Sequence, residues 1–356
     1  MQDIRTEVLV VDPIHPEPSV IRHAAKLLYD GEVVVFPTET VYGLGADAFQ
    51  PAALERIFAA KGRPYSDPLI VHIADERTLE LLTTTIPEQA KRLAQAFWPG
   101  PLTLILFRGP SVPHLVTAGL ETVAVRMPRH AVALALIRTL GSPIAAPSAN
   151  RFMHVSPTMA QHALADLAGR VPLILDAGPC EIGVESTVLD LCSEVPRILR
   201  PGGVSLEALR SVLPDVQPPM RSKASGENED IVAKKAPGQL LTHYAPAVPL
   251  LLFDGPVEAM RASMLAEVHR QCAHGERVGV LVADEDVQVF SDSGALIYAL
   301  GSADEPAEVA TKLFAGLRAL EEAHVQVILC RNFGEQGLGL AIRDRLLKAA
   351  GGKVFE

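Results

Sequence analysis

Short apolar runs alternate with helix-like patterns along the first 213 residues. The runs are rich in Val, Ile and Leu, as in buried strands, and they predict strands at 32–36, 68–73, 101–107, 122–127, 143–146, 171–178, 186–191 and 197–200. Apolar residues between them follow the helical period, and the pattern predicts helices at 20–30 with Ser19 as N-cap, at 51–61, 87–97 and 131–140, after Pro157, and from Ser205. This alternation predicts an α/β domain over 1–213, a twisted open sheet with helices.

The pattern is lost at 214–245 and returns afterwards. Residues 214–237 are rich in Pro, Ser, Gly and charges, which is typical of a linker or loop. Apolar runs at 248–253, 278–282 and 325–330 then alternate with helical patterns. We therefore expect a linker or loop at 214–245 and a smaller, Rossmann-like α/β domain with a parallel sheet at 246–356.

Composition narrows the class of protein. The chain has 356 residues and a formal net charge of −10, so no overall electrostatic attraction to nucleic acid is expected. Its four cysteines have neither CxxC nor metal-like spacing with histidine, which predicts reduced thiols. The sequence has no apolar signal core and no run of about 18 apolar residues. We expect a cytoplasmic protein without membrane contact.

The segment Gly43–Ala48 fits the pattern G-x-G-x-x-A of a dinucleotide-binding fingerprint. That fingerprint should follow a strand directly and meet an acid about twenty residues later. Here six residues intervene, and the later positions hold Lys61 and Arg63. We interpret the glycines as a turn that needs glycine dihedral angles, and a nicotinamide oxidoreductase ranks last among the alternatives.

Polar residues gather where the predicted strands end. Thr38, Glu39 and Thr40 follow one strand, in the position where open α/β sheets place ligands. Lys61 and Arg63 surround a glycine and precede prolines, so they either bind phosphate or carboxylate, or pair with Asp67 or Glu55 in a solvated loop. These two interpretations stay open at this point.

A second polar group comes from later strands. Ser148 and Asn150 alternate after an apolar strand, and Ser156 precedes a predicted helix whose N–H groups favour an anion. Arg126 lies in an apolar strand and must meet a structural acid or a bound carboxylate. His72, in a similar strand, is by itself more typical of a core residue than of a ligand. Together these residues suit an anionic, phosphate-bearing small molecule.

The same stretches, taken in order, resemble one family. The segments FPTETVYGLG, KGRPYSDPLIVHI, FWPGPLTLIL, VAVRMP, APSAN, GVESTVLDL and ILRPGG are similar to the YrdC-type domain of threonylcarbamoyl-AMP synthases. APGQLLTHYAP and the small α/β domain after it resemble the longer, two-domain form. The resemblance implies condensation of L-threonine, bicarbonate and ATP to threonylcarbamoyl-AMP and pyrophosphate, for threonylcarbamoyladenosine modification of tRNA.

The resemblance also implies roles for individual residues. The catalytic set would be Lys61, Arg63, Ser148 and Asn150, and the threonine-binding set would be Thr40, His72, Arg126 and Ser186. The nucleotide-binding set would be Arg63, Asp67, Thr122, Ser148, Ser156, Arg200, His243 and Tyr244, with the last two acting as a lid. Asp67 stands where asparagine is common in the family. No metal-binding side chain is expected, because Mg²⁺ would come with ATP.

The resemblance further implies that the product passes to a tRNA-modifying threonylcarbamoyl transferase complex, and it leaves direct tRNA contact open. The main alternative is an RNA-binding module in tRNA or ribosome maturation. The net charge of −10 and the lack of aromatic stacking motifs speak against it. A carbamoyl transferase of the hydrogenase-maturation type would need zinc-finger-like cysteines and an acylphosphatase-like part, and the chain has neither.

Overall fold

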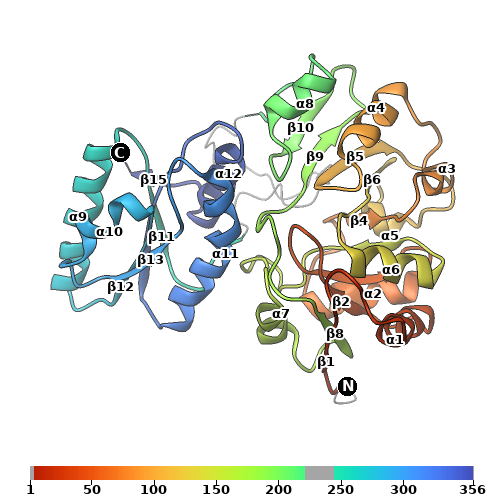
Figure 1. Ribbon diagram of the computed structural model, residues 1–356, viewed down its shortest axis with the longest axis horizontal. Helices are drawn as coiled ribbons and strands as arrows, with labels where there is room; N and C mark the ends of the chain where they lie inside the picture. Colours follow the sequence, from red (N-terminus) through yellow and green to blue (C-terminus); the bar gives the residue numbers. More distant parts are fainter. Residues whose placement is uncertain (1–3, 221–243, 356) are drawn as a thin grey trace. The chain divides into compact units, whose positions relative to one another are not determined.

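The computed structural model describes residues 4–220 and 244–355, which group into two compact units. Of these residues, the first unit takes 4–152, 157–181 and 185–220, and the second takes 153–156, 182–184 and 244–355. Each unit has its own sheet with helices packed against it (Figure 1). The predicted α/β fold is confirmed. Most of the expected linker lies outside the described residues, and its boundaries stay predictions.

Within residues 4–220, the sheet of the first unit has ten strands in the order β1-β8-β2-β3-β7-β4-β6-β5-β9-β10. Their bounds are β1 Glu7–Val10, β2 Val34–Phe36, β3 Gly43–Asp47, β4 Ile70–His72, β5 Leu102–Phe107, β6 Thr122–Arg126, β7 Ile144–Ala146, β8 Leu173–Asp176, β9 Thr187–Asp190 and β10 Arg197–Arg200. The sheet is mixed: β4 and β6 run parallel, for example, whereas β7 runs antiparallel to β4.

Helices pack on both faces of this sheet. Their bounds are α1 Pro18–Tyr29, α2 Pro51–Lys61, η1 Glu76–Thr78, α3 Leu79–Leu82, α4 Glu88–Phe97, α5 His114–Thr117, α6 Ala131–Leu140, α7 Ala160–Leu167 and α8 Leu206–Val212. Apolar residues of α2, α4, α7 and α8 share one core with Val71, Leu104 and Val125. Helices α1 and α6 pack on the opposite face, over Phe36 and Ile144.

The remainder of that second face carries the polar residues. Side chains two positions apart on a strand share a face, so His72 lies on the same side as Ile70, and Arg126 on the same side as Ala124. Ile70, Ala124, Ile105 and Val188 form a small apolar cluster to which no described helix contributes. On the face formed by β4, β5, β6 and β9, polar side chains such as Arg126 therefore lie without a described helix packed on them.

Three local predictions were wrong. Gly43 and Gly45 lie in the extended strand β3 and not in a turn. A Cβ on Gly45 would come within 2.7 Å of atoms of both Ile144 and Phe36, so glycine is needed there for close packing. Helix α1 begins at Pro18 with Glu17 as its N-cap residue, so Ser19 lies inside the helix.

The third error concerns the helix expected after Pro157. Helix α7 begins only at Ala160, with Met159 as its N-cap residue. Ser156 is therefore not at a helix N-terminus, and the argument that it borders an anion-binding helix end fails. Ser156 is buried and belongs to the second unit.

The sheet of the second unit is parallel, as predicted. Among the described residues its strands run in the order β13-β12-β14-β11-β15, with bounds β11 Leu250–Phe253, β12 Val278–Val282, β13 Leu296–Ala299, β14 Val327–Arg331 and β15 Val354–Phe355. The helical segments are α9 Val257–Ala273, η2 Asp284–Asp286, α10 Val287–Phe290, α11 Pro306–Glu322 and α12 Gly339–Ala349. Val280 packs in the α9 core, whereas its neighbour Gly279 faces Leu320 of α11.

Candidate active site

Lys61 is the last residue of α2 and is only 3% exposed. The helix stops there because Gly62 adopts a left-handed conformation with φ of +66°, which glycine tolerates best. The Lys61 ammonium donates hydrogen bonds to the backbone carbonyls of Ser148, at 2.6 Å, and of Asn150. The end of α2 is thereby tied to the segment that follows β7, and the charge is held in one place.

Arg63 forms a buried ion pair with Asp67. The guanidinium nitrogen Nη2 lies 3.0 Å from the Asp67 carboxylate and donates to the carbonyl of Pro68 at 2.8 Å. The sequence left open whether Arg63 serves a ligand or pairs with an acid, and the structure shows the pair. It also fixes the plane of the guanidinium, because several of its donors bind within one short loop.

Arg126 of β6 meets the structural acid that an apolar strand requires. Its Nη2 lies 2.8 Å from Oε2 of Glu39, and both side chains are at most 4% exposed. The guanidinium also donates to the Thr40 hydroxyl at 2.9 Å and to the carbonyl of Gly100 at 3.2 Å. Glu39 and Thr40, in the polar turn after β2, therefore bind the Arg126 guanidinium.

His72 is neutral at physiological pH. Burial, and next the nearby Arg126 charge, lower its pKa to about 3. The two residues are register partners on β4 and β6. The imidazole contacts the Phe36 ring edge-on, and its Nδ1 lies 3.1 Å from the carbonyl oxygen of Ile70. His72 therefore offers a hydrogen-bonding group without adding a second positive charge beside Arg126.

The depressed pKa of His72 makes the first unit less stable in acid. Below pH 6.5, His72 becomes protonated in the unfolded chain, whereas in the folded chain it stays neutral down to about pH 3. The free energy of unfolding therefore falls as the pH falls from 6.5 to 3. The contribution of His72 should approach about 1.4 kcal/mol per pH unit. We expect a His72→Gln variant to lack this slope in urea unfolding, followed through the fluorescence of Trp98, the single tryptophan.

The slope is compared, and not the absolute stability, because the substitution also changes packing. Exposed His23, 3.6 Å from Glu7, provides the matched control His23→Gln. If the free energy of unfolding had the same pH dependence in the wild type and His72→Gln between pH 7 and pH 4, the pKa of His72 would be the same in the folded and unfolded chain, and the prediction would be wrong.

Ser186, which directly precedes β9, is held by two other side chains. Its hydroxyl lies 2.8 Å from the Thr103 hydroxyl. Arg200, at the end of β10, donates to the Ser186 hydroxyl at 3.1 Å and to its carbonyl at 2.9 Å. Ser186 and Arg200 were assigned to different substrates in the sequence analysis, and the structure brings them into direct contact.

Backbone hydrogen bonds join the loops that carry these groups. The N–H of Ala149 donates to the carbonyl of Tyr42 at 2.8 Å, and the N–H of Leu44 donates to the carbonyl of Pro147 at 2.9 Å. The turn after β2, whose Glu39 and Thr40 bind Arg126, and the segment after β7, whose carbonyls bind Lys61, are therefore neighbours. Thr122, partly exposed at the start of β6, lies on the same face of its strand as Arg126.

The proposed lid residues are described only in part. His243 lies outside the described residues. Tyr244 is buried in the second unit, where its ring stacks on Phe314 with centroids 5.8 Å apart. The Arg345 guanidinium lies 4.9 Å from the centroid of the same ring. Tyr244 is thus part of the core of the second unit.

Two site residues were missed by sequence reasoning. Glu39 was recognised as part of a polar turn but was given no role, and Thr103 was not noticed. Each had a signal in the sequence: Glu39 is the one charged residue in the segment 33–46, and Thr103 is the one hydroxyl residue in the apolar strand β5. Neither signal identifies a partner, because the partners come from other strands.

The candidate site contains several buried charges. Lys61, Arg63, Arg126 and Arg200 are each at most 7% exposed, and Asp67 and Glu39 form ion pairs with Arg63 and Arg126. Across 4–220 and 244–355, no three His, Cys, Asp or Glu side chains are close enough together to hold a metal ion. The same residues include no helix with the length and apolar character of a membrane span.

Known domain families cover nearly the whole chain. A family described as telomere recombination matches residues 26–202, and the C-terminal domain of threonylcarbamoyl-AMP synthase matches residues 204–351. The chain is 46% identical over 356 residues to the threonylcarbamoyl-AMP synthase of Bacillus subtilis (strain 168), with 100% of both chains covered. It is 44% identical over 336 residues to that of Pyrococcus abyssi, covering 94% of this chain and 95% of the relative.

Solved structures agree with these matches. The crystal structure of Pyrococcus abyssi Sua5 complexed with L-threonine superposes with a TM-score of 0.90 at 42% identity, covering 98% of this chain and 99% of the other. Escherichia coli YciO matches 55% of this chain and 96% of its own length, with a TM-score of 0.50 at 25% identity. The similarity extends over both units of the chain, which therefore belongs to the threonylcarbamoyl-AMP synthase family in its two-domain form.

Proposed function

We propose that this chain is an L-threonylcarbamoyladenylate synthase, a nucleotidyltransferase. Threonine's amine and bicarbonate combine to a carbamate with loss of water, and a carbamate oxygen then attacks the α-phosphorus of ATP as pyrophosphate leaves. The products are threonylcarbamoyl-AMP, pyrophosphate and water. The reaction needs no covalent bond to the protein, and it requires bound anions to be held together.

The observation that carries this proposal is the similarity over 98% of the chain to a structure complexed with L-threonine. The buried cations of the site agree with it. Lys61, Arg63, Arg126 and Arg200 are all buried, although the whole chain has a net charge of −10. Such cations suit a triphosphate and an amino-acid carboxylate, since fixed cations stabilise anions without reorganisation.

In this proposal the residues divide into two groups. Lys61 and Arg63, with Ser148 and Asn150, bind the phosphates and stabilise the charge that develops as pyrophosphate leaves. Thr40, His72, Arg126 and Ser186 hold threonine, with Arg126 binding its carboxylate. The nucleotide side further includes Asp67, Thr122 and Arg200 of the first unit.

The reaction also involves a metal ion, an acceptor for the product and a cellular compartment. Mg²⁺ would be held mainly by the ATP phosphates and would offset their charge, because this ion is usually held by substrate phosphates and few protein groups. Lys61, Arg63 and Arg126 bind and orient the anions. The product, which hydrolyses readily, passes to a threonylcarbamoyl transferase complex that acts on tRNA. We place the reaction in the cytoplasm.

The test is release of pyrophosphate from ATP and Mg²⁺ by the full chain, with threonine and bicarbonate omitted in turn. We expect release only when both are present, and much less release with serine than with threonine. Release that does not depend on threonine, or no release at all, would contradict the proposal. The RNA-binding alternative would then be tested by the salt dependence of tRNA affinity.

A further inference from the structure

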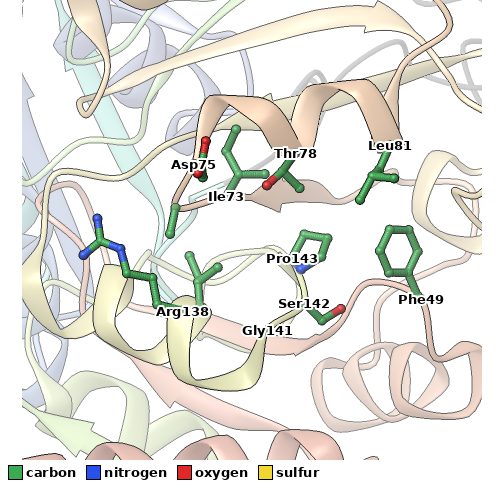
Figure 2. Close-up of a pocket in the computed structure, with 11 residues that line it drawn as sticks. Phe49, Ile73, Asp75, Thr78, Leu81, Arg138, Gly141, Ser142 and Pro143 are labelled. Atoms are coloured by element: carbon green, nitrogen blue, oxygen red, sulfur yellow. The ribbon is translucent and has the colours of Figure 1, made fainter.

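The first unit contains a pocket whose lining includes none of the predicted site residues. Its volume is ≈ 410 Å³. One wall is the segment from Ile73 through η1 to Leu81, and the other is the end of α6 with residues 141–143 (Figure 2). Its size lies within the range of small-molecule pockets, and no function described above uses it.

The two ends of this pocket differ in polarity. Figure 2 shows Asp75 and Arg138 at one end, on opposite walls, and Phe49 and Leu81 at the other end, beside the Ser142 hydroxyl, which donates to the Asp47 carboxylate at 2.7 Å. Pro143 lies between them on the floor. A charged end that carries both signs and an apolar end therefore face the same cavity.

The charged groups are available to a ligand. Within the described parts of the chain, the Arg138 side chain has no hydrogen bond or ion pair. Asp75 caps η1 through the N–H of Arg77 at 2.9 Å, and its carboxylate lies 3.4 Å from the Arg77 side chain. That ion pair joins side chains 88% and 55% exposed, so it contributes little and does not exclude another partner.

We propose that this pocket binds a free apolar α-amino acid. Such a molecule carries its ammonium and its carboxylate on one carbon, which matches Asp75 and Arg138 at one end of the pocket. Its side chain then extends between Phe49 and Leu81. The Phe49 ring and the Leu81 side chain offer apolar contact area there, so apolar amino acids are preferred. The proposal is independent of the reaction proposed above.

Binding is measured by isothermal titration of the full chain, with saturating L-threonine present to fill any threonine site. The ligands are leucine, isoleucine, methionine and phenylalanine, compared with serine, aspartate and lysine. We expect at least one apolar amino acid to bind with a Kd of about 1 mM or below, and the polar ones to bind more weakly.

Variants identify the pocket as the site. Arg138→Gln and Asp75→Asn should each weaken binding about tenfold or more, the effect of losing a charge-assisted hydrogen bond. Asparagine still caps η1, so the second change spares the fold. Arg22→Gln, an exposed position on α1, is the matched control and should bind as the wild type does. Leu81→Ser, at a position 57% exposed, should reduce the preference for apolar ligands.

Two results would overturn the proposal. One is the absence of heat from any apolar amino acid at about 10 mM, well above the expected Kd. The other is an unchanged Kd in both Arg138→Gln and Asp75→Asn, which would place the ligand elsewhere. Thermal unfolding without ligand shows whether each variant folds, and if one charge variant does not, the other and Leu81→Ser decide the question.

Discussion

Replacing Lys61 with methionine is expected to lower the rate of threonine-dependent pyrophosphate release by more than about a hundredfold. This is the scale of losing one preorganised electrostatic contact to a developing charge. The ammonium is already fixed by the carbonyls of Ser148 and Asn150. Methionine keeps most of the length of the side chain and removes only the charge and its hydrogen bonds.

The matched control is Lys26→Met on α1, where the lysine is 72% exposed and pairs with Asp30. It should leave the rate unchanged. Thermal unfolding of both variants separates loss of the charge from loss of the fold. A folded Lys61→Met variant with the wild-type rate would remove Lys61 from the catalytic set.

The second large effect is expected at the Glu39–Arg126 pair. Glu39→Gln should destabilise the first unit by about 3–5 kcal/mol, because it leaves the Arg126 charge buried without its acid. The two side chains are 1% and 4% exposed, so water does not compensate. Urea unfolding followed through Trp98 reports on this unit, since the chain has one tryptophan and it lies in the first unit.

A double variant separates the two roles of Arg126. Glu39→Gln combined with Arg126→Met removes both charges and should recover most of the stability lost by Glu39→Gln alone. Activity should stay low, because the proposed carboxylate partner of threonine is gone. Glu55→Gln, at an exposed position on α2, is the control. Additive effects of the two changes on stability would show that the pair does not interact.

Much of the fold follows from local pattern. The strands around His72 and Arg126 were expected within one or two residues of where they lie, because apolar runs of this length suit buried strands. The helix that ends at Lys61 was also expected, since Gly62 marks its end. The strand at Gly43–Asp47 was missed, because its glycines resemble a turn until Phe36 and Ile144 are known to pack on it.

The composition of the site was predictable for a different reason. The polar residues stand at strand ends or alternate within apolar strands, where an unpaired polar group is costly. Arg126 therefore had to have a partner, and the sequence required an acid or a bound carboxylate. It did not specify Glu39, because many acids along the chain were equally available.

The sequence by itself determined most of the strands and helices, their α/β alternation and the kind of chemistry the polar residues can support. These depend on residues close together in the chain. Only the tertiary structure decided the partners: Lys61 binds a carbonyl 87 residues away, and Arg126 binds a hydroxyl 86 residues away. The physical reason is that such contacts are set by strand order and register, which depend on the packing of the whole sheet.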